Sequence, residues 1–260
     1  MSSEIPQVRN FTIGGVGISC VDRARAIGCF FDLIAAKCGG YVTATGAHAI
    51  VEAQTDLRLR EIVNAARMSL PDGMPVQWTG RLKQASVERV HGADFFEGVL
   101  RDPRAASVRH YFYGGKPEIL ARIVTRATEL IGCDAICGWH SPPIRAIGAI
   151  EEASVAAEIL ASRPGVIWVG LGTPKQEYWM GNHTARFPAS LLVGVGAAFD
   201  YFAGELNRAP YVMQLAGLEW LARLVEEPRR LWPRYSRIVP RMIGIMAREA
   251  LDRRKAHRTT

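Results

Sequence analysis

The stretch Val166–Met180, "VIWVGLGTPKQEYWM", changes from one kind of secondary structure to another within a few residues. It begins as a run of apolar residues rich in valine and isoleucine, the pattern of a strand buried on both faces. Gly170 and Gly172 then interrupt the run, and Pro174 suits the first turn of a helix. A strand that leads through a small-residue turn into a helix is the repeating unit of a parallel α/β sheet.

The same unit recurs along most of the chain. Short apolar runs predict strands, and these are Phe11–Ser19, Gly40–Ala44, Met68–Leu70, Arg109–Tyr113, Asp134–Gly138, Val166–Gly170 and Ser190–Val195. Amphipathic stretches between them predict helices, and these are Arg23–Lys37, Ala47–Ala66, Ala93–Leu100, Pro117–Ile131, Ile144–Ser162 and Pro174–Arg186. Elements that alternate in this way predict an α/β fold class, with a Rossmann-like, mostly parallel sheet flanked by helices.

From about Tyr211 the alternation stops, and no further strand is predicted. Pro228, Pro233 and Pro240 punctuate this region, so we expect several short helices, because proline ends or starts a helix. The sequence therefore predicts two parts. Residues 1–210 form an α/β catalytic domain, and residues 211–260 form a basic helical appendage.

The positive charge of the protein is confined to its last part. The net charge is +7, and residues 222–260 alone carry eleven Lys and Arg against four Asp and Glu. Ile238, Met242 and Ile245 recur there at helical spacing beside a stripe of arginines, which is a cationic amphipathic pattern. Such a helix either packs on the core with a solvated basic face or contacts an anionic membrane surface. A basic tail on a neutral body favours an anionic partner.

Targeting signals and cysteines give weaker indications of the compartment and of disulfide or metal sites. The segment "MSSEIPQVRN" has no apolar signal region, so we expect a cytoplasmic protein, and no apolar run reaches the roughly 18 residues of a membrane span. The five cysteines are odd in number and fit reduced thiols better than a disulfide framework. Cys133, Cys137 and His140 lack a fourth ligand nearby, which makes a zinc site a weak hypothesis.

The loops that follow predicted strands are the first places to look for a site, because parallel sheets bind ligands at the carboxyl ends of their strands. In "SLPDGMPVQW", Asp72 directly follows a strand. An aspartate there either caps the next helix or serves as a general base. Downstream, Arg81, Lys83 and Arg89 are candidates to face an anionic ligand.

Three more strand exits carry glycines, which allow backbone N–H groups to approach a phosphate. Their positions are Gly114, Gly115, Gly170, Gly172, Gly194 and Gly196. Gln176 and Glu177 follow the second exit, and Asp200 follows the third. A plain turn or tight packing would explain these glycines equally well. The loops match neither the Walker pattern nor G-x-G-x-x-G, and the chain has no G-x-S-x-G and no Asp-x-Asp.

Taken in order, these loops resemble one family. The segments "PDGMPVQW", "ERVHGADF", "YFYGGKPEIL", "VGLGTPKQE" and "GVGAAFDYFAGELNRAP", with "GLEWLARLVEEPRRLWPRY" after them, are similar to the signature of the WecG/TagA/CpsF glycosyltransferases. The resemblance runs from about Gly14 to Tyr235. Each segment alone is only moderately specific, but their shared order is highly specific.

The resemblance implies transfer of a sugar from a UDP-sugar to a polyprenyl-diphosphate-linked saccharide, in exopolysaccharide or cell-surface polysaccharide synthesis. It implies inversion at the anomeric carbon and no metal or other cofactor, with the UDP-sugar as donor substrate. It places the protein in the cytoplasm, at the inner face of the plasma membrane, with its basic helices on the anionic surface. Nucleic acid is not an expected partner, and a homo-oligomer is one open alternative.

The resemblance also implies roles for single residues. Asp72 matches the proposed general base, Arg89 a diphosphate or acceptor contact, and Gln176 a residue of the substrate crevice. Arg229, Arg230 and Arg234 match arginines of the appendage. The predicted substrate-binding set is Thr43, Thr45, Arg89, Gly114, Gly115, Gly172, Gln176, Gly194, Gly196, Arg230 and Arg234. In "YVTATGAHAIVEA" the sequence departs from the family, because Gly46 stands where an asparagine is usual.

Two other functions stay open at this point. A Rossmann-type nucleotide-dependent oxidoreductase would explain the alternation and the glycine loops, although G-x-G-x-x-G and a following ribose-binding acid are missing. A non-enzymatic protein that binds membranes or nucleic acids would explain the basic tail. The neutral body with its four strand-exit loops argues against this third function.

Overall fold

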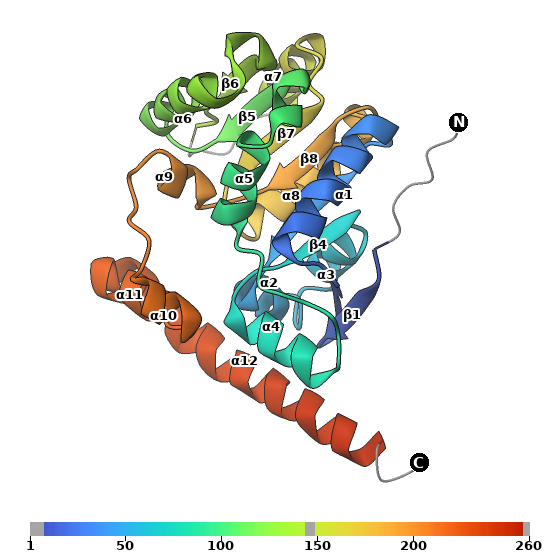
Figure 1. Cartoon of the computed structure of the whole chain (residues 1–260), viewed down its shortest axis with the longest axis vertical. Helices are drawn as coiled ribbons and strands as arrows, with labels where there is room; N and C mark the ends of the chain where they lie inside the picture. Colours follow the sequence, from blue (N-terminus) through green and yellow to red (C-terminus); the bar gives the residue numbers. More distant parts are fainter. Residues whose placement is uncertain (1–7, 144–148, 257–260) are drawn as a thin grey trace.

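A computed structural model describes residues 8–143 and 149–256, and it confirms the α/β fold class (Figure 1). Six strands form one sheet in the order β4-β3-β8-β7-β5-β6, and every neighbouring pair is parallel. Their bounds are β3 Tyr41–Thr45, β4 Met68–Pro71, β5 His110–Gly114, β6 Ile136–His140, β7 Val166–Gly170 and β8 Leu191–Gly194.

Helices cover both faces of this sheet. One face carries α1 (Arg23–Ala36), α5 (Gly92–Leu100), α6 (Pro117–Ile131) and α9 (Ala198–Phe202), and the other carries α3 (Leu57–Asn64), α7 (Ala149–Ala161) and α8 (Lys175–His183). Strand β7 packs against both sets of helices. Val166 and Trp168 face the first set of helices, while Ile167 and Val169 face the second. Strands buried on both faces are therefore continuously apolar.

The predicted strand Phe11–Ser19 is wrong as a single element. It is an antiparallel hairpin of β1 (Asn10–Ile13) and β2 (Val16–Ser19), which forms a small sheet of its own. Gly14 and Gly15 make the turn with φ values of 56° and 79°. Glycine takes this left-handed conformation without steric cost, and a tight hairpin turn requires it.

One predicted helix is divided in the structure, and one observed helix was not predicted. The predicted helix Ala47–Ala66 is divided into α2 (Ala47–Glu52) and α3, because Asp56 caps α3 by accepting a hydrogen bond of 3.0 Å from the Leu59 N–H. Helix α4 (Met74–Leu82) had not been predicted. Three short 3₁₀ turns complete the chain up to α9: η1 (Pro103–Ser107), η2 (Cys133–Ala135) and η3 (Thr184–Arg186). The first five residues of the predicted helix Ile144–Ser162 lie outside the described residues.

After α9 the chain is helical, with α10 (Tyr211–Leu215), α11 (Glu219–Glu226) and α12 (Pro228–Ala256). The expectation of several short helices is wrong for the last part, because α12 continues through Pro233 and Pro240. A proline inside a helix costs about 3 kcal/mol. Packing offsets this cost: Ile238, Met242 and Ile245 are buried against the β1–β2 hairpin, α2 and α4, and each such side chain contributes roughly 1.5–3 kcal/mol.

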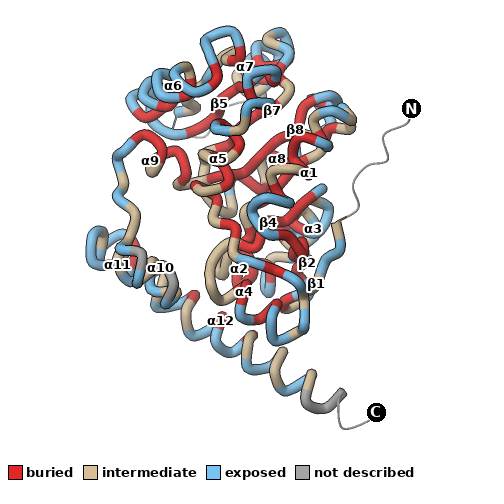
Figure 2. The backbone as a smooth tube through the Cα atoms, in the orientation of Figure 1, coloured by how far each residue is buried: buried red, intermediate tan, exposed pale blue. Residues whose placement is uncertain are grey.

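Helix α12 therefore lies along one edge of the molecule, beside α4 (Figure 1). Its inner side is buried and its outer side is exposed (Figure 2). Among the described residues, no helix is long and apolar enough to cross a membrane. The division of the chain at residue 210 coincides with the start of α10, but separate folding of the two parts stays a prediction.

The contact that fixes the far end of α12 can be tested by substitution. Glu249 accepts a hydrogen bond of 2.8 Å from the Gly14 N–H and pairs with Lys83 of α4. We expect Glu249→Ala to weaken the attachment by about 1–3 kcal/mol, the value of hydrogen bonds to a charged group. Amide hydrogens in the last turns of α12 should then exchange with solvent about tenfold faster or more.

Asp252→Ala is the matched control, since Asp252 is an exposed carboxylate on the same helix. Its effect should stay within about 0.5 kcal/mol. Equal exchange rates in the two variants would show that Glu249 does not hold the helix.

Candidate functional site

The carboxyl ends of the parallel strands meet at one edge of the sheet, and the predicted loops gather there. Asp72 follows β4, Gly46 follows β3, and Gly196 follows β8. Gly172 and Gln176 follow β7, and Gly115 follows β5. The structure thus brings together loops that are far apart in the sequence, as the general rule for ligand sites in open α/β sheets predicts.

Asp72 carries the carboxylate at this edge. Gly73 is the N-cap of α4, and it offers no side-chain cap bond, so the alternative that Asp72 caps the helix is wrong. No described residue forms a hydrogen bond to the Asp72 carboxylate. The side chain keeps some contact with solvent, yet burial raises its pKa to about 6, against the opposing charge of Arg89. The carboxylate is therefore ionised above about pH 6 and its oxygens are available.

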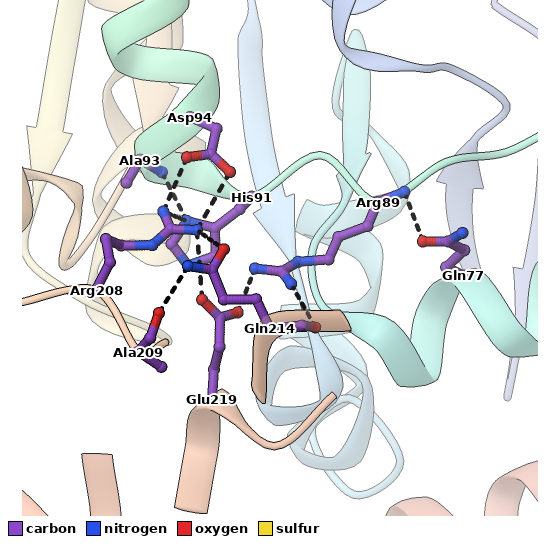
Figure 3. Close-up of polar contacts among 9 residues, drawn as sticks. All are labelled: Gln77, Arg89, His91, Ala93, Asp94, Arg208, Ala209, Gln214 and Glu219. Atoms are coloured by element: carbon purple, nitrogen blue, oxygen red, sulfur yellow. Dashed lines mark hydrogen bonds and ion pairs between the residues drawn. The ribbon is translucent and has the colours of Figure 1, made fainter. Parts of the chain in front are cut away.

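Arg89 lies near Asp72 and is held by the C-terminal helices (Figure 3). Its backbone N–H donates to Gln77 Oε1 over 3.0 Å, its guanidinium donates to the Gln214 carbonyl over 3.2 Å, and it forms an ion pair with Glu219. Its side chain is only 12% exposed. Its buried Nε–H has no partner among the described residues, and contact of Arg89 with a ligand stays a prediction.

Arg208 is the centre of the same network and was not predicted. It donates to Asp94 Oδ1 over 2.9 Å and to Gln214 Oε1 over 3.1 Å, and it pairs with Glu219 over 3.3 Å (Figure 3). These contacts tie α10 and α11 to α5. Arg208 and Glu219 stand within motifs already noted, "GELNRAP" and "GLEW". Their partners Asp94 and Arg89 lie 114 and 130 positions away, so spacing gives no signal for the pairs.

His91 joins this network as a neutral acceptor. It is the N-cap of α5, and its Nδ1 lies 3.3 Å from the Ala93 N–H and 2.9 Å from a guanidinium nitrogen of Arg208. Burial, together with the charges of Arg208 and Arg89, holds its pKa well below the usual value. A neutral imidazole can accept these hydrogen bonds, whereas a protonated one cannot.

Helix α8 follows β7 at the same edge of the sheet. Gln176 is 2% exposed and donates from Nε2 to Glu177 Oε1 over 3.0 Å. A Cβ atom on Gly194 would lie 3.1 Å from Gln176 Nε2 and 2.7 Å from Met180 Cε. Gly194 is therefore small because Gln176 and Met180 occupy the space beside it. Gly172, with φ +75°, has nothing within 4 Å of its Cβ position and faces an open space.

Two residues of the predicted substrate-binding set are buried in the sheet. Thr43 and Thr45 of β3 are fully buried and share a hydrogen bond of 3.0 Å, and Thr45 accepts another from Ser69. Their hydroxyls are thus engaged within the protein, and contact with a donor substrate stays a prediction. Gly46 lies directly beside Asp72, because a Cβ atom there would be 3.1 Å from the Asp72 carbonyl oxygen.

The glycines after β5 have a structural explanation. Gly114 has φ +106°, and a Cβ atom on it would lie 2.7 Å from the Gly170 carbonyl oxygen of β7. Close strand pairing therefore requires glycine at this position. Gly115 accepts a hydrogen bond of 2.7 Å from Ser141 at its carbonyl. A ligand role for either glycine stays a prediction.

Two of the basic residues that were predicted to meet a ligand, Lys83 and Arg230, form ion pairs within the protein. Lys83 pairs with Glu249, on the side away from Asp72's loop, so it is not free to face a ligand. Arg230 is half exposed and pairs with Glu227. Its charge opposes the rise that burial causes in the pKa of Asp200, which follows β8.

Arg234 lies near the loop after β3. Burial and, secondly, the charge of Arg234 lower the pKa of His48 in α2 to about 4. The first turns of α12 thus stand close to the carboxyl edge of the sheet. No hydrogen bond or ion pair among the described residues joins Arg230 or Arg234 to Asp72, so their contact with substrate stays a prediction.

Metal ligands are a separate question. Within residues 8–143 and 149–256, no three His, Cys, Asp or Glu side chains are grouped so that they could hold a metal ion. Cys133, Cys137 and His140 accordingly do not form the zinc site that was considered.

A Rossmann-like parallel sheet with a carboxylate of raised pKa beside arginines, all at its carboxyl edge, has the architecture of an α/β enzyme that acts on phosphorylated ligands. The comparison with known families agrees, since the model of the family described as "Glycosyl transferase WecG/TagA/CpsF family" matches residues 11–256. The protein belongs to this family and is a glycosyltransferase. Membership implies a sugar-nucleotide donor and a lipid-linked acceptor in general terms, and it decides against the oxidoreductase and the non-enzymatic binding protein.

The network around Arg208 should contribute more to the free energy of unfolding than an exposed ion pair does. Arg208→Gln leaves Asp94 and Glu219 without their shared cation, and we expect a loss of about 1–3 kcal/mol in the free energy of unfolding. The pKa of Asp72 should also rise, because the charge of Arg208 lowers it. Urea denaturation and NMR titration would measure the two effects.

Arg122→Gln provides the control, since Arg122 pairs with Glu205 where both side chains are 54% exposed. An exposed pair is worth about 0.2–1 kcal/mol. Similar losses in the two variants would contradict a special role for the Arg208 network.

Proposed function

We propose that the protein is an inverting, metal-independent glycosyltransferase that moves a sugar from a UDP-sugar to a polyprenyl-diphosphate-linked saccharide. Its product would serve exopolysaccharide or cell-surface polysaccharide synthesis. The observation that carries this proposal is the Asp72 carboxylate, which stands at the sheet edge with a raised pKa and no hydrogen-bond partner among the described residues. Family membership supports the glycosyl transfer itself.

Asp72 acts as the general base in this proposal. Its carboxylate takes the proton from the acceptor hydroxyl as the oxygen attacks the anomeric carbon from the face opposite UDP. The new C–O bond forms as the bond to the diphosphate breaks, and UDP leaves with the electron pair. A pKa of about 6 suits this role, because the base is ionised near neutral pH but retains more basicity than an ordinary aspartate.

Arg89 stabilises the leaving diphosphate. Its guanidinium is nearly buried, and its Nε–H is unpaired among the described residues. A charge-assisted hydrogen bond to phosphate is strong in such a site, where little water competes. Backbone N–H groups of the loop at Gly172 supply further donors in this proposal, whereas the Gly196 N–H already donates to the Val169 carbonyl over 3.4 Å. In this proposal these donors take the place of a metal ion.

The outer face of α12 contacts the membrane in this proposal. The helix packs on the core through one side, which leaves the other side exposed (Figure 2). Trp232 and Ile243 are 63% and 61% exposed there, and exposed arginines flank them at positions 229, 237, 241 and 248. Apolar side chains beside arginines suit the interface of an anionic bilayer. We therefore propose a peripheral protein at the cytoplasmic face of the plasma membrane.

The role of Asp72 can be tested by Asp72→Asn. We expect turnover to fall about 10²- to 10⁴-fold, the contribution of a general base, while UDP affinity changes little. For the wild type, kcat/KM should rise with pH through about 6 and then level off, since the ionised form is active. Near-normal turnover of the variant would reject Asp72 as the base.

Stability provides the control for that variant. The folded state favours the protonated form of Asp72, so the wild type loses stability as pH rises from about 4 to about 6. The asparagine side chain avoids this loss. Asp72→Asn should therefore unfold at an equal or higher temperature than the wild type at pH 8, which separates loss of chemistry from loss of fold.

A screen of UDP-sugars tests the donor and the metal together. Thermal shift and UDP release should be measured with a lipid-diphosphate saccharide present, with and without EDTA. We expect at least one UDP-sugar to stabilise the protein and to be turned over equally in EDTA. Loss of activity in EDTA that Mg²⁺ or Mn²⁺ restores would contradict metal independence.

The membrane contact needs variants that leave the core intact. Removal of α12 would expose the buried cluster around Met242, so substitutions on its outer face are the sharper test. Trp232→Ser combined with Ile243→Ser should lower binding to anionic vesicles about tenfold or more, at unchanged UDP affinity. Leu57→Ser, at a 58% exposed position on α3, is the control. Unchanged vesicle binding by the double variant would refute this membrane contact.

A further inference from the structure

Two neighbouring side chains at the start of α8 are buried although each keeps one oxygen atom unpaired. Gln176 is 2% exposed and Glu177 is 0% exposed. Among the described residues, neither Gln176 Oε1 nor Glu177 Oε2 has a hydrogen-bond partner. A buried acceptor without a partner loses its hydration without compensation, so native proteins rarely keep one for no reason. The proposed base, Asp72, does not explain either atom.

The contacts of Glu177 fix the orientation of the neighbouring amide. Glu177 Oε1 accepts hydrogen bonds of 3.0 Å from Gln176 Nε2 and 3.0 Å from Thr173 Oγ1. The reverse orientation of the amide would bring its oxygen against the carboxyl oxygen, which is repulsive. The orientation is the same whether Glu177 is ionised or protonated, because Oε2 is free to carry the proton. Burial raises the pKa of Glu177.

The amide oxygen then points into a gap between two glycines. Gln176 Oε1 lies 3.4 Å from the position that a Cβ atom on Gly196 would occupy, and the Cα of Gly172 lies 3.8 Å from that same position. Gly172 itself has nothing within 4 Å of its own Cβ position. The gap lies at the carboxyl ends of β7 and β8, where ligands bind in this class of sheet.

We propose that Glu177 is a positioning residue, which holds Gln176 so that Oε1 accepts a hydrogen bond from a neutral O–H or N–H group of the ligand. This inference rests on the proposed function. An amide oxygen repels phosphate oxygens, so its partner is not the diphosphate. A UDP-sugar offers three kinds of neutral donor, which are the hydroxyls of the transferred sugar, the hydroxyls of the ribose and the imide N–H of the uracil base.

The positioning is tested first without any ligand. Glu177→Gln keeps an acceptor oxygen, whereas Glu177→Met keeps a similar volume but removes the acceptor. We expect the side-chain amide protons of Gln176, assigned by their loss in Gln176→Ala, to exchange slowly with water in the wild type and in Glu177→Gln. They should exchange at least tenfold faster in Glu177→Met. Unchanged exchange in Glu177→Met would overturn the positioning role.

Thermal unfolding checks that each variant is folded. If Glu177→Met does not fold, Glu177→Ala removes the same acceptor with a smaller side chain and carries the same expectation. Rescue by Glu177→Gln is the result that a general loss of packing or charge would not give.

The ligand's donor group is tested next, by calorimetric titration with UDP and with the UDP-sugar found in the screen. Gln176→Ala and Glu177→Met should each weaken binding about tenfold, and the double variant should be no weaker, because both changes remove the same hydrogen bond. Loss with the UDP-sugar but not with UDP identifies a sugar hydroxyl. Equal loss with both ligands identifies a donor of the uridine part, either a ribose hydroxyl or the uracil imide, and 2′-deoxy-UDP, which lacks one ribose hydroxyl, then tests that group.

Two further outcomes are distinguishable. Additive losses in the double variant would overturn the proposal, since the two residues would then act independently. If the wild type binds no UDP-sugar while the amide of Gln176 stays protected by Glu177, the proposed function fails and the positioning of Gln176 by Glu177 stands.

Discussion

Parallel pairing of six strands is the constraint on which the site depends. Because all strands run in the same direction, every connection returns outside the sheet and every strand ends at the same edge. Residues as distant in sequence as Asp72 and Gln176 therefore lie at the same edge of the sheet. Gly114 shows how closely this arrangement is packed, since a methyl group there would strike the backbone of β7. The edge is thus a product of the whole sheet and not of any single motif.

A second constraint comes from charges that are removed from water. Arg89, Arg208, Glu219 and Asp94 are joined in one network that links α5 to the helices after β8 (Figure 3). A partly buried ion pair is not by itself a strong source of stability, but the loss of one partner leaves the others uncompensated. The network thereby couples the position of α10 and α11 to the environment of Asp72. The packing of α10 and α11 and the pKa of Asp72 are therefore set by the same charged groups.

The fold class was predictable because it depends on local patterns. Continuous apolar runs gave the six parallel strands, and glycine or proline marked most of their exits. One of the errors has a local cause and another has a tertiary cause. The turn at Gly14 and Gly15 lies within one apolar run, so periodicity did not reveal it. Pro240 indicated a helix end, but the burial of Ile238 and Met242 on the core outweighed that local preference.

The candidate site was predictable only in part, for a related reason. Asp72 directly follows a strand and Gln176 begins the helix after one, so their positions alone indicate a site, whereas Arg89 lies between two helices and was indicated by the family resemblance. Arg208 and Glu219 act through partners more than one hundred residues away, and no periodic pattern records such pairs. The contact of Glu177 with Gln176 is local, yet a glutamate in the first turn of a helix has an ordinary explanation in the helix dipole. Only the complete burial of Glu177 in the structure distinguishes it from a glutamate with that ordinary role.

The uneven distribution of charge has a consequence for how the molecule approaches a surface. The first 221 residues are neutral overall, whereas the region that contains α12 carries the whole net charge of +7. Because α12 is fixed along one edge by Glu249 and by its apolar side, this asymmetry gives the protein a permanent electric dipole. In the field of an anionic bilayer such a dipole experiences a torque before any contact forms. If α12 makes the membrane contact proposed above, the molecule would arrive already turned, and its first collisions would be made with the edge that carries α12.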